Sequence, residues 1–206
     1  MSTHPSLLVL AGIDACGKTT VLEMISKQYT HFKVLQWKDL SKTKETYICL
    51  PSDPASYVES LPPMNRALFF GGLIWELYEK QIRPSLDAGQ TVIVDSYCYK
   101  WWAKETILKL SDPILDTIFS SLPKPDLVVF IDTDPSTVIT RKIMSSYEKQ
   151  GTTPAEAVDF QATVRNGMLK LIPAAKLRIV DGNTSLEQVY HKASQIMQQY
   201  SEEVAI

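Results

Sequence analysis

The sequence predicts an α/β fold in which a five-stranded parallel sheet is flanked by helices on both faces. The first observation is that short, mostly apolar runs alternate along the chain with longer segments of helical periodicity, an alternation typical of parallel sheets covered by helices. The second observation is the size and composition of the chain. Its 206 residues are 45% hydrophobic and 21% charged, which suits one full-sized core, so we expect one domain over residues 1–206.

The five predicted strands are short and mostly apolar. We expect them at residues 7–12, 32–37, 91–95, 127–132 and 177–181. Helical periodicity places helices near residues 19–30, 63–88, 97–121, 135–150, 155–174 and 184–200. Three further stretches, residues 41–47, 51–54 and 148–154, carry turn-forming residues and little to bury, so we expect mobile loops there.

Composition excludes several classes of partner. The formal net charge of -2 argues against a broad basic face, and hence against a nucleic acid polymer or an anionic membrane as a partner. The longest apolar run, residues 67–75, is much shorter than the roughly 20 residues that cross a bilayer, and the first residues lack the pattern of a secretory signal. The three cysteines show no metal-ligand spacing, so we expect free thiols and a cytoplasmic location.

The stretch between the first strand and the first helix predicts a phosphate-binding site. Gly12, Gly17, Lys18 and Thr19 match the pattern G-x-x-x-x-G-K-[ST] in the strand-to-helix context that this motif requires. The glycines allow a tight turn whose N–H groups point into one concavity, and the helix start adds its positive dipole end. A plain glycine turn beside a surface lysine is the alternative, but it gives no reason for the run Gly-Lys-Thr-Thr.

The side chains of this loop have different expected tasks. We expect Lys18 to place its charge on the β- and γ-phosphates of a nucleotide, and Thr19 to hold Mg²⁺ through its hydroxyl group. Asp14 would repel phosphates unless it bound a metal ion or an acceptor hydroxyl group, so we assign it to the acceptor side. Cys16 is either an oxidisable thiol or a small residue that packs well. The predicted nucleotide-binding residues of the loop are Gly12, Ala15, Cys16, Gly17, Lys18, Thr19 and Thr20.

Asp95 ends the third predicted strand, where a carboxylate can hold Mg²⁺ or its bound waters. The alternative is an aspartate that only caps the helix expected from residue 97. With Lys18 and Asp14, Asp95 forms the predicted catalytic set. These residues predict that nucleotide phosphates bind, but they do not say what is done with them.

Four segments of the chain together resemble thymidylate kinases in order and spacing. They are residues 12–20 (GIDACGKTT), 82–97 (IRPSLDAGQTVIVDSY), 125–141 (PDLVVFIDTDPSTVITR) and 180–189 (VDGNTSLEQV), and the resemblance extends over nearly the whole chain. It implies a three-layer P-loop kinase fold of the nucleoside monophosphate kinase type. It also implies ATP with Mg²⁺ as phosphoryl donor, a mobile lid near residues 143–154, and a homodimer.

The resemblance implies roles for single residues as well. Asp14 corresponds to an acidic position near the acceptor sugar and the transferred phosphoryl group, and Asp95 to the aspartate of the family's Asp-Arg-Tyr motif. Tyr97 ends this motif and is expected in the acceptor site. Phe70 falls where the family stacks an aromatic ring on the acceptor base, although by pattern alone an aromatic residue on a long amphipathic helix is core. Arg141 matches a position near the donor adenine.

Several arginines that the resemblance implies are absent. Three acceptor-side positions hold Ser96, Ile74 and Cys49, and none of these side chains can bind phosphate bidentately. The family's catalytic arginine is also absent, because positions 15 and 16 are Ala and Cys and residues 143–157 contain no arginine.

Other cations are candidates for the missing charge. Lys100 and Lys104 lie one turn apart on a predicted helix and could supply it from another direction; the alternative is a solvated lysine face. Arg66 is a further candidate, and its alternative is a surface residue. We assign Lys100, together with Asp14, Phe70 and Tyr97, to the predicted acceptor site.

Three functions are consistent with these residues. The first is ATP-dependent phosphoryl transfer to a nucleoside monophosphate, as in thymidylate kinases. The second is a sibling kinase whose acceptor is another nucleotide or a small metabolite, and the third is a non-catalytic nucleotide-binding protein. Retention of Lys18, Thr19, Asp14 and Asp95 argues against the third, because a protein that only binds nucleotide does not need the complete set for metal and phosphate.

Overall fold

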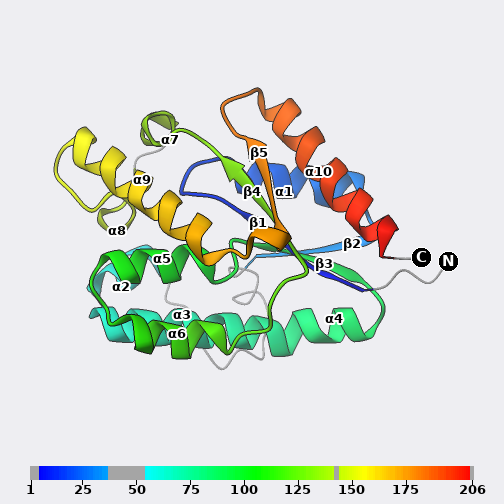
Figure 1. Ribbon diagram of the computed structural model, residues 1–206, viewed down its shortest axis with the longest axis horizontal. Coiled ribbons are helices and arrows are strands. Elements are labelled where there is room, and N and C mark those ends of the chain that lie inside the picture. The colour runs from blue at the N-terminus through cyan, green and yellow to red at the C-terminus, as the bar shows by residue number, and fades with distance from the viewer. Residues whose placement is uncertain (1–4, 37–53, 142–143, 205–206) are drawn as a thin grey trace.

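The sheet of the molecule has five parallel strands. The computed structural model describes residues 5–36, 54–141 and 144–204. The strands are β1 (Leu7–Ala11), β2 (Phe32–Leu35), β3 (Thr91–Asp95), β4 (Leu127–Asp132) and β5 (Leu177–Asp181), and their order is β2-β3-β1-β4-β5 (Figure 1). The predicted parallel sheet is confirmed, although β2 ends at Leu35; position 37 lies outside the described residues, as do the predicted loop at 41–47 and most of that at 51–54.

Strand β1 is the centre of this sheet and is buried along its whole length. Leu10 of β1 pairs with Asp95 of β3 on one side and with Val129 of β4 on the other. The strand order therefore reverses at β1, and in open α/β sheets ligands bind beside the carboxyl ends of the strands at such a point. The loop after β1 and the end of β3 meet at this place.

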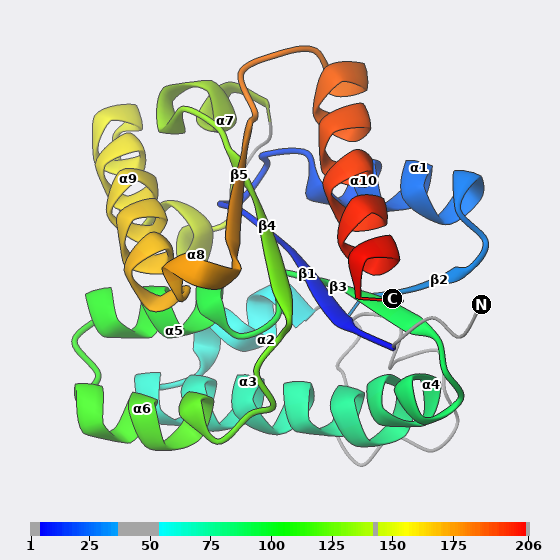
Figure 2. The same ribbon diagram turned by 45° about the vertical axis from the view of Figure 1, so that its right-hand side comes forward.

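Helices cover both faces of the sheet (Figure 2). α1 (Lys18–Gln28) and α10 (Leu186–Glu203) lie against each other on one face. The other face carries α3 (Pro63–Leu77), which continues through a π-helical turn (Tyr78–Ile82) into α4 (Arg83–Asp87), so the long helix expected at 63–88 is confirmed. Within the described ranges, no helix is both long enough and apolar enough to cross a membrane.

The prediction of one helix over 97–121 is wrong, because the chain forms α5 (Tyr99–Ile107) and α6 (Asp112–Ser120). Lys109, between them, has a φ of 65°, and this left-handed conformation ends a helix. Pro113 then lies in the first turn of α6, where proline is tolerated because no intrahelical N–H is needed. The short helix α2 (Pro54–Ser60) was not predicted from the sequence.

Between β4 and β5 the described residues form three α-helices, where two helices were expected near 135–150 and 155–174. They are α7 (Pro135–Arg141), the four-residue α8 (Ser146–Lys149) and α9 (Pro154–Leu171), which contacts α5 and α7. α9 begins with a capping box, in which Thr153 and Glu156 each accept a backbone N–H of the other. A single 3-10 turn, Ala174–Lys176, precedes β5. We call residues 144–153 the lid segment.

Candidate active site

The loop between β1 and α1 has a backbone that only glycine fits at two positions. Gly12 has a φ of 150° and Gly17 a φ of 98°, both in the region that side chains disfavour. A Cβ atom on Gly12 would lie 2.7 Å from the sulfur of Cys16 and 2.8 Å from the carbonyl oxygen of Ile131. The tight turn expected from the P-loop motif is therefore present.

Lys18 lies in the first turn of α1 and its side chain folds back over the loop. Its Nζ donates hydrogen bonds to the carbonyl oxygens of Gly12 (2.9 Å) and Ile13 (2.8 Å) and lies 3.4 Å from the sulfur of Cys16. The side chain is 7% exposed, so the alternative of a plain surface lysine is wrong. Cys16 is buried between this ammonium group and Gly12, which supports the packing explanation for a small residue there.

One cavity of about 460 Å³ lies in front of this loop. This volume is within the range typical of ligand sites. Most of the predicted site residues line it, and Gln36, Ser96 and Glu148 join them. The lining consists of Asp14, Ala15, Gly17, Lys18, Thr19, Thr20, Gln36, Asp95, Ser96, Lys100, Arg141 and Glu148.

Asp14 is held between two lysines of α5 at one end of this cavity. The Nζ atoms of Lys100 and Lys104 lie 2.9 Å and 2.7 Å from its two carboxylate oxygens. The side chain of Lys104 is 1% exposed and that of Lys100 is 16% exposed. The alternative of a solvated lysine face is therefore wrong, because both ammonium groups pair with Asp14.

The charges of this cluster shift one another's proton affinities. Burial by itself raises the pKa of Asp14, but the charges of Lys100, Lys104 and Lys18 outweigh burial and hold that pKa well below its ordinary value. Burial lowers the pKa of Lys104, and the attraction of Asp14 offsets this only in part. For Lys100 the attraction of Asp14 prevails over burial and the pKa is raised.

A second buried ion pair lies beside the first. Arg66 of α3 donates to both carboxylate oxygens of Glu105 of α5, at 2.8 Å and 3.0 Å. Glu105 is fully buried and Arg66 is 8% exposed, so the alternative of a surface residue at position 66 is wrong. The hydroxyl group of Tyr147, in the lid segment, donates to the same carboxylate at 2.9 Å.

The predicted acceptor-site aromatic residues do not line the cavity. Phe70 is buried and stacks on Trp101, with ring centroids 4.4 Å apart and an interplanar angle of 14°. Tyr97 is 2% exposed, and its hydroxyl group donates to the carbonyl oxygen of Pro123 at 2.7 Å. Its placement in the acceptor site is thus not supported, because the turn at Ser96 and Tyr97, both with positive φ, directs the side chain into the core.

Thr19 and Asp95 supply a hydroxyl and a carboxylate oxygen to the same cavity wall. This donor set fits Mg²⁺, which binds proteins through one or two oxygen ligands and otherwise keeps waters and substrate phosphates. Among the described residues, no group of three or more His, Cys, Asp or Glu side chains could hold a metal ion. Asp95 accepts a hydrogen bond from Ser96 at 2.8 Å. The capping alternative is not supported, since α5 begins later, at Tyr99 after Cys98.

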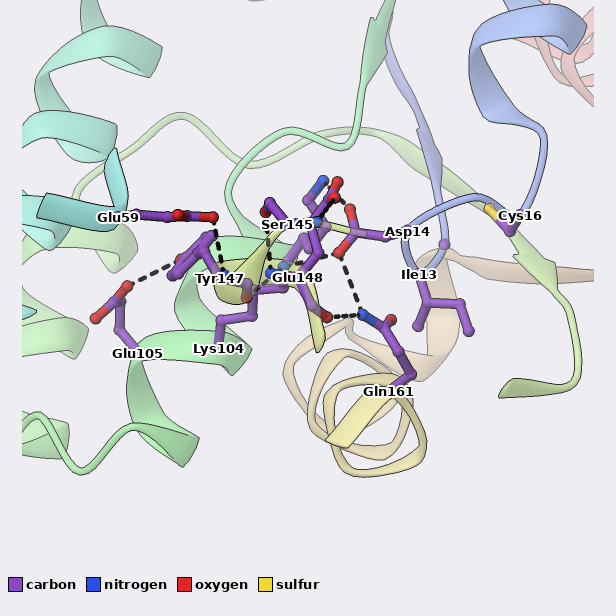
Figure 3. A network of polar contacts seen from close by, with 12 residues as sticks. Ile13, Asp14, Cys16, Glu59, Lys104, Glu105, Ser145, Tyr147, Glu148 and Gln161 are labelled. Atoms are coloured by element: carbon purple, nitrogen blue, oxygen red, sulfur yellow. Dashed lines mark hydrogen bonds and ion pairs between the residues drawn. The ribbon is translucent and has the colours of Figure 1, made fainter. Parts of the chain in front are cut away.

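Four polar residues near Asp14 were not singled out from the sequence (Figure 3). Gln161 of α9 is fully buried, and its amide nitrogen contacts Asp14 Oδ2 at 3.4 Å and the backbone oxygen of Glu148. Tyr147 and Glu148 come from the lid segment, and Glu105 from α5. No spacing in the sequence signals these residues, because their partners lie far away along the chain: Glu105 is 42 positions from Tyr147, and Asp14 is 147 positions from Gln161.

The chain matches the family model described as thymidylate kinase over residues 56–193. A thymidylate kinase from Thermoanaerobacter sp. (strain X514) is 26% identical over 200 residues, covering 92% of this chain and 95% of the relative. A probable thymidylate kinase from Pyrococcus abyssi is 30% identical over 202 residues, covering 89% of this chain and 91% of the relative.

Two solved structures share the fold. The thymidylate kinase of Candida albicans superposes with a TM-score of 0.72 at 24% identity, covering 97% of this chain and 94% of that one. The thymidylate kinase of Ehrlichia chaffeensis gives a TM-score of 0.63 at 17% identity, covering 94% of this chain and 99% of that one. The expected P-loop kinase fold is therefore confirmed.

Proposed function

We propose the following reaction for this chain, which belongs to the thymidylate kinase family: the γ-phosphoryl group of ATP is transferred to the phosphate of dTMP. Membership makes the chain a nucleoside monophosphate kinase that uses ATP. In this reaction a phosphate oxygen of the acceptor attacks the γ-phosphorus. The bond from that phosphorus to the oxygen bridging the β-phosphate breaks, and ADP leaves.

The proposal rests on one observation: residues of the P-loop and residues assigned to the acceptor side line the same cavity. Lys18 and Thr19 of the P-loop line this cavity, and so do Asp95, Lys100 and Asp14. Phosphoryl transfer depends almost entirely on positioning and on the neutralisation of phosphate charge. A cavity that presents a P-loop and an acceptor-side cation together meets both needs.

On the donor side, we assign the phosphates of ATP to the loop from Gly12 to Thr20. Lys18 neutralises charge on the β- and γ-phosphates, and Arg141, at the cavity edge, is placed beside the adenine. Thr19 and Asp95 would hold Mg²⁺, which would supply positive charge to neutralise the charge that develops on the phosphates.

On the acceptor side, we assign the missing arginine charge to the lysines of α5. Lys100 lines the cavity, and Lys104 lies behind it on the same carboxylate. Asp14 orients both ammonium groups through its two oxygens. A lysine grips phosphate as a point charge without the fork geometry of arginine, so the grip depends on how firmly Asp14 holds it.

A coupled assay of ADP release tests the proposal. Purified protein is given ATP, Mg²⁺ and one of a panel of nucleoside monophosphates, nucleosides and small hydroxylated or phosphorylated metabolites. We expect ADP release with dTMP at a kcat/KM of about 10⁴ M⁻¹s⁻¹ or above. Release with no member of the panel, from protein whose circular dichroism shows a folded α/β chain, would contradict the kinase assignment.

A second candidate, a sibling kinase with a different acceptor, is favoured by the stacking of Trp101 on Phe70. That stack occupies one face of the ring that the family resemblance assigns to the acceptor base. Ser96 and the buried Ile74 also leave the acceptor without two expected arginines. Efficient release with another acceptor and weak release with dTMP in the same panel would select this candidate.

The homodimer, the single domain and the cytoplasmic location remain part of the proposal. Sedimentation at several protein concentrations tests the dimer, and fractionation of cells tests the location.

A further inference from the structure

Tyr147 connects the lid segment to two buried ion pairs, Lys104–Asp14 and Arg66–Glu105. It belongs to the four-residue helix α8, yet its side chain is only 8% exposed. Its hydroxyl group donates to Glu105 of α5 at 2.9 Å, and its ring centroid lies 4.5 Å from the Lys104 ammonium nitrogen and 5.2 Å from the Arg66 guanidinium carbon. One side chain of the lid segment therefore contacts charged groups from both α3 and α5.

Lys104 joins this lid residue to the P-loop. Its Nζ contacts Asp14 Oδ2 at 2.7 Å and donates to the backbone oxygen of Tyr147 at 3.4 Å. An ammonium group with 1% exposure is stable only while such partners stay in place, because burial disfavours its charge. The ring and the carbonyl group of Tyr147 supply two of these partners.

Neighbouring hydrogen bonds also hold the lid segment in place. The backbone N–H of Tyr147 donates to Glu59 of α2 at 3.2 Å, and the amide nitrogen of Gln161 contacts both Asp14 and the backbone of Glu148. Two consecutive residues of the lid segment are thereby tied to the groups that surround Asp14 (Figure 3).

We propose that Tyr147 is a positioning residue that holds Lys104 against Asp14, so that the lysine pair on the acceptor side is complete only while α8 is docked. The kinetic meaning of this proposal rests on the proposed kinase function. Undocking of α8 removes the ring and the carbonyl oxygen from Lys104 and admits water to it. Lys104 then turns away from Asp14, and the carboxylate that orients Lys100 loses one of its two ammonium partners.

Two variants and a matched control test the positioning role. Tyr147→Leu removes the ring and the hydroxyl group, whereas Tyr147→Phe keeps the ring over Lys104 and removes only the hydroxyl group. The same two changes at Tyr57 of α2, which is 40% exposed, serve as controls. We expect Tyr147→Leu to raise the KM for the acceptor about tenfold, the scale of one lost cation–π contact at a desolvated site, with the KM for ATP unchanged. Tyr147→Phe should recover most of this loss.

Hydrogen exchange of the ligand-free protein tests the docking itself and needs no activity. We expect exchange at residues 144–153 to become about tenfold faster in Tyr147→Leu and to change less in Tyr147→Phe, with no change in either Tyr57 variant. If Tyr147→Leu does not fold, faster exchange in Tyr147→Phe carries the same test.

Two results would overturn the positioning role. One is unchanged lid exchange in both Tyr147 variants, and the other is an equal rise of the KM values for acceptor and ATP. Failure of the kinase proposal is distinguishable, because it appears as a wild-type protein without ADP release while the exchange measurement still reports docking.

Discussion

The donor end of the cavity consists mainly of backbone groups, and the acceptor end consists mainly of side chains. The donor end is a loop of backbone groups, tightened by Gly12 and Gly17, that joins one strand to the following helix. The acceptor end is a group of buried charged side chains, Asp14, Arg66, Lys104 and Glu105, which the uncharged side chains of Gln161 in α9 and Tyr147 in the lid segment contact. We therefore expect substitutions to affect the two ends differently. Backbone groups remain in place when most side chains are changed, whereas a buried charge becomes destabilising when its partner is removed.

The largest effect is expected where a buried charge loses its partner. Glu105→Gln leaves the guanidinium group of Arg66 buried without a carboxylate, and we expect the free energy of unfolding to fall by about 3–5 kcal/mol. Urea unfolding measures this loss. Glu79→Gln is the matched control, because Glu79 pairs with Arg83 at the exposed surface and should cost less than about 1 kcal/mol. Similar small losses in both variants would remove the contrast in fragility.

The next effect concerns the one donor-end side chain that acts by its charge. Lys18→Ala should lower kcat by about 100-fold or more, the scale of removing one preorganised electrostatic contact. Lys27→Ala, on the exposed side of the same helix, should leave kcat unchanged. Steady-state kinetics with a circular dichroism check decides the matter, and normal turnover by a folded Lys18→Ala protein would refute the donor assignment.

A third experiment asks whether the acceptor end grips phosphate through Lys100. Lys100→Ala should raise the KM for the acceptor about 10- to 100-fold, since hydrogen bonds to charged groups contribute roughly 1.5–3 kcal/mol, and should change the KM for ATP much less. The exposed Lys124 provides the control change Lys124→Ala. A rise confined to the KM for ATP would instead place Lys100 at the donor end.

The smallest effect concerns acid. The pKa of Asp14 is held well below its ordinary value of 3.8, so its ion pairs stabilise the fold fully above that value and are lost as the pH falls through the lowered pKa. Asp14→Asn should therefore be less stable than the wild type at pH ~7, and this difference should shrink by about 1–2 kcal/mol near pH ~2. Urea unfolding of both proteins at the two pH values measures it; a difference independent of pH would mean that Asp14 does not carry the charge.

The donor end could be predicted from the sequence because its residues are consecutive. The spacing of Gly12, Gly17 and Lys18 encodes a turn, and apolar runs encode the five strands around it. The break at Lys109 was missed, because a left-handed lysine has no signature in helical periodicity and the nearby Pro113 suits a helix start as well as an end.

The acceptor end was predicted only in part: Asp14 and Lys100 were assigned to it, but the burial and the partners of its charged side chains were not predicted. Lysine and arginine side chains are usually exposed to solvent. Only the fold shows that Lys100, Lys104 and Arg66 have buried carboxylate partners. Asp14 and Gln161 are separated by 147 positions in the chain, so no local pattern can connect them. Tyr97 is the opposite case. Its position in the family motif predicted a place in the acceptor site, but the turn after β3 directs its side chain into the core.

The central position of β1 has a consequence for synthesis on the ribosome. β1 is made first among the strands, yet its neighbours are β3 and β4, and Leu7 receives its carboxylate partner Asp126 only 119 positions later. At about 5–20 residues per second, this stretch takes roughly 6–24 s to translate. Throughout that time the apolar run Leu7–Ala11 has no completed sheet to enter. The nascent chain therefore folds correctly only if aggregation of this strand is slow or a chaperone binds it.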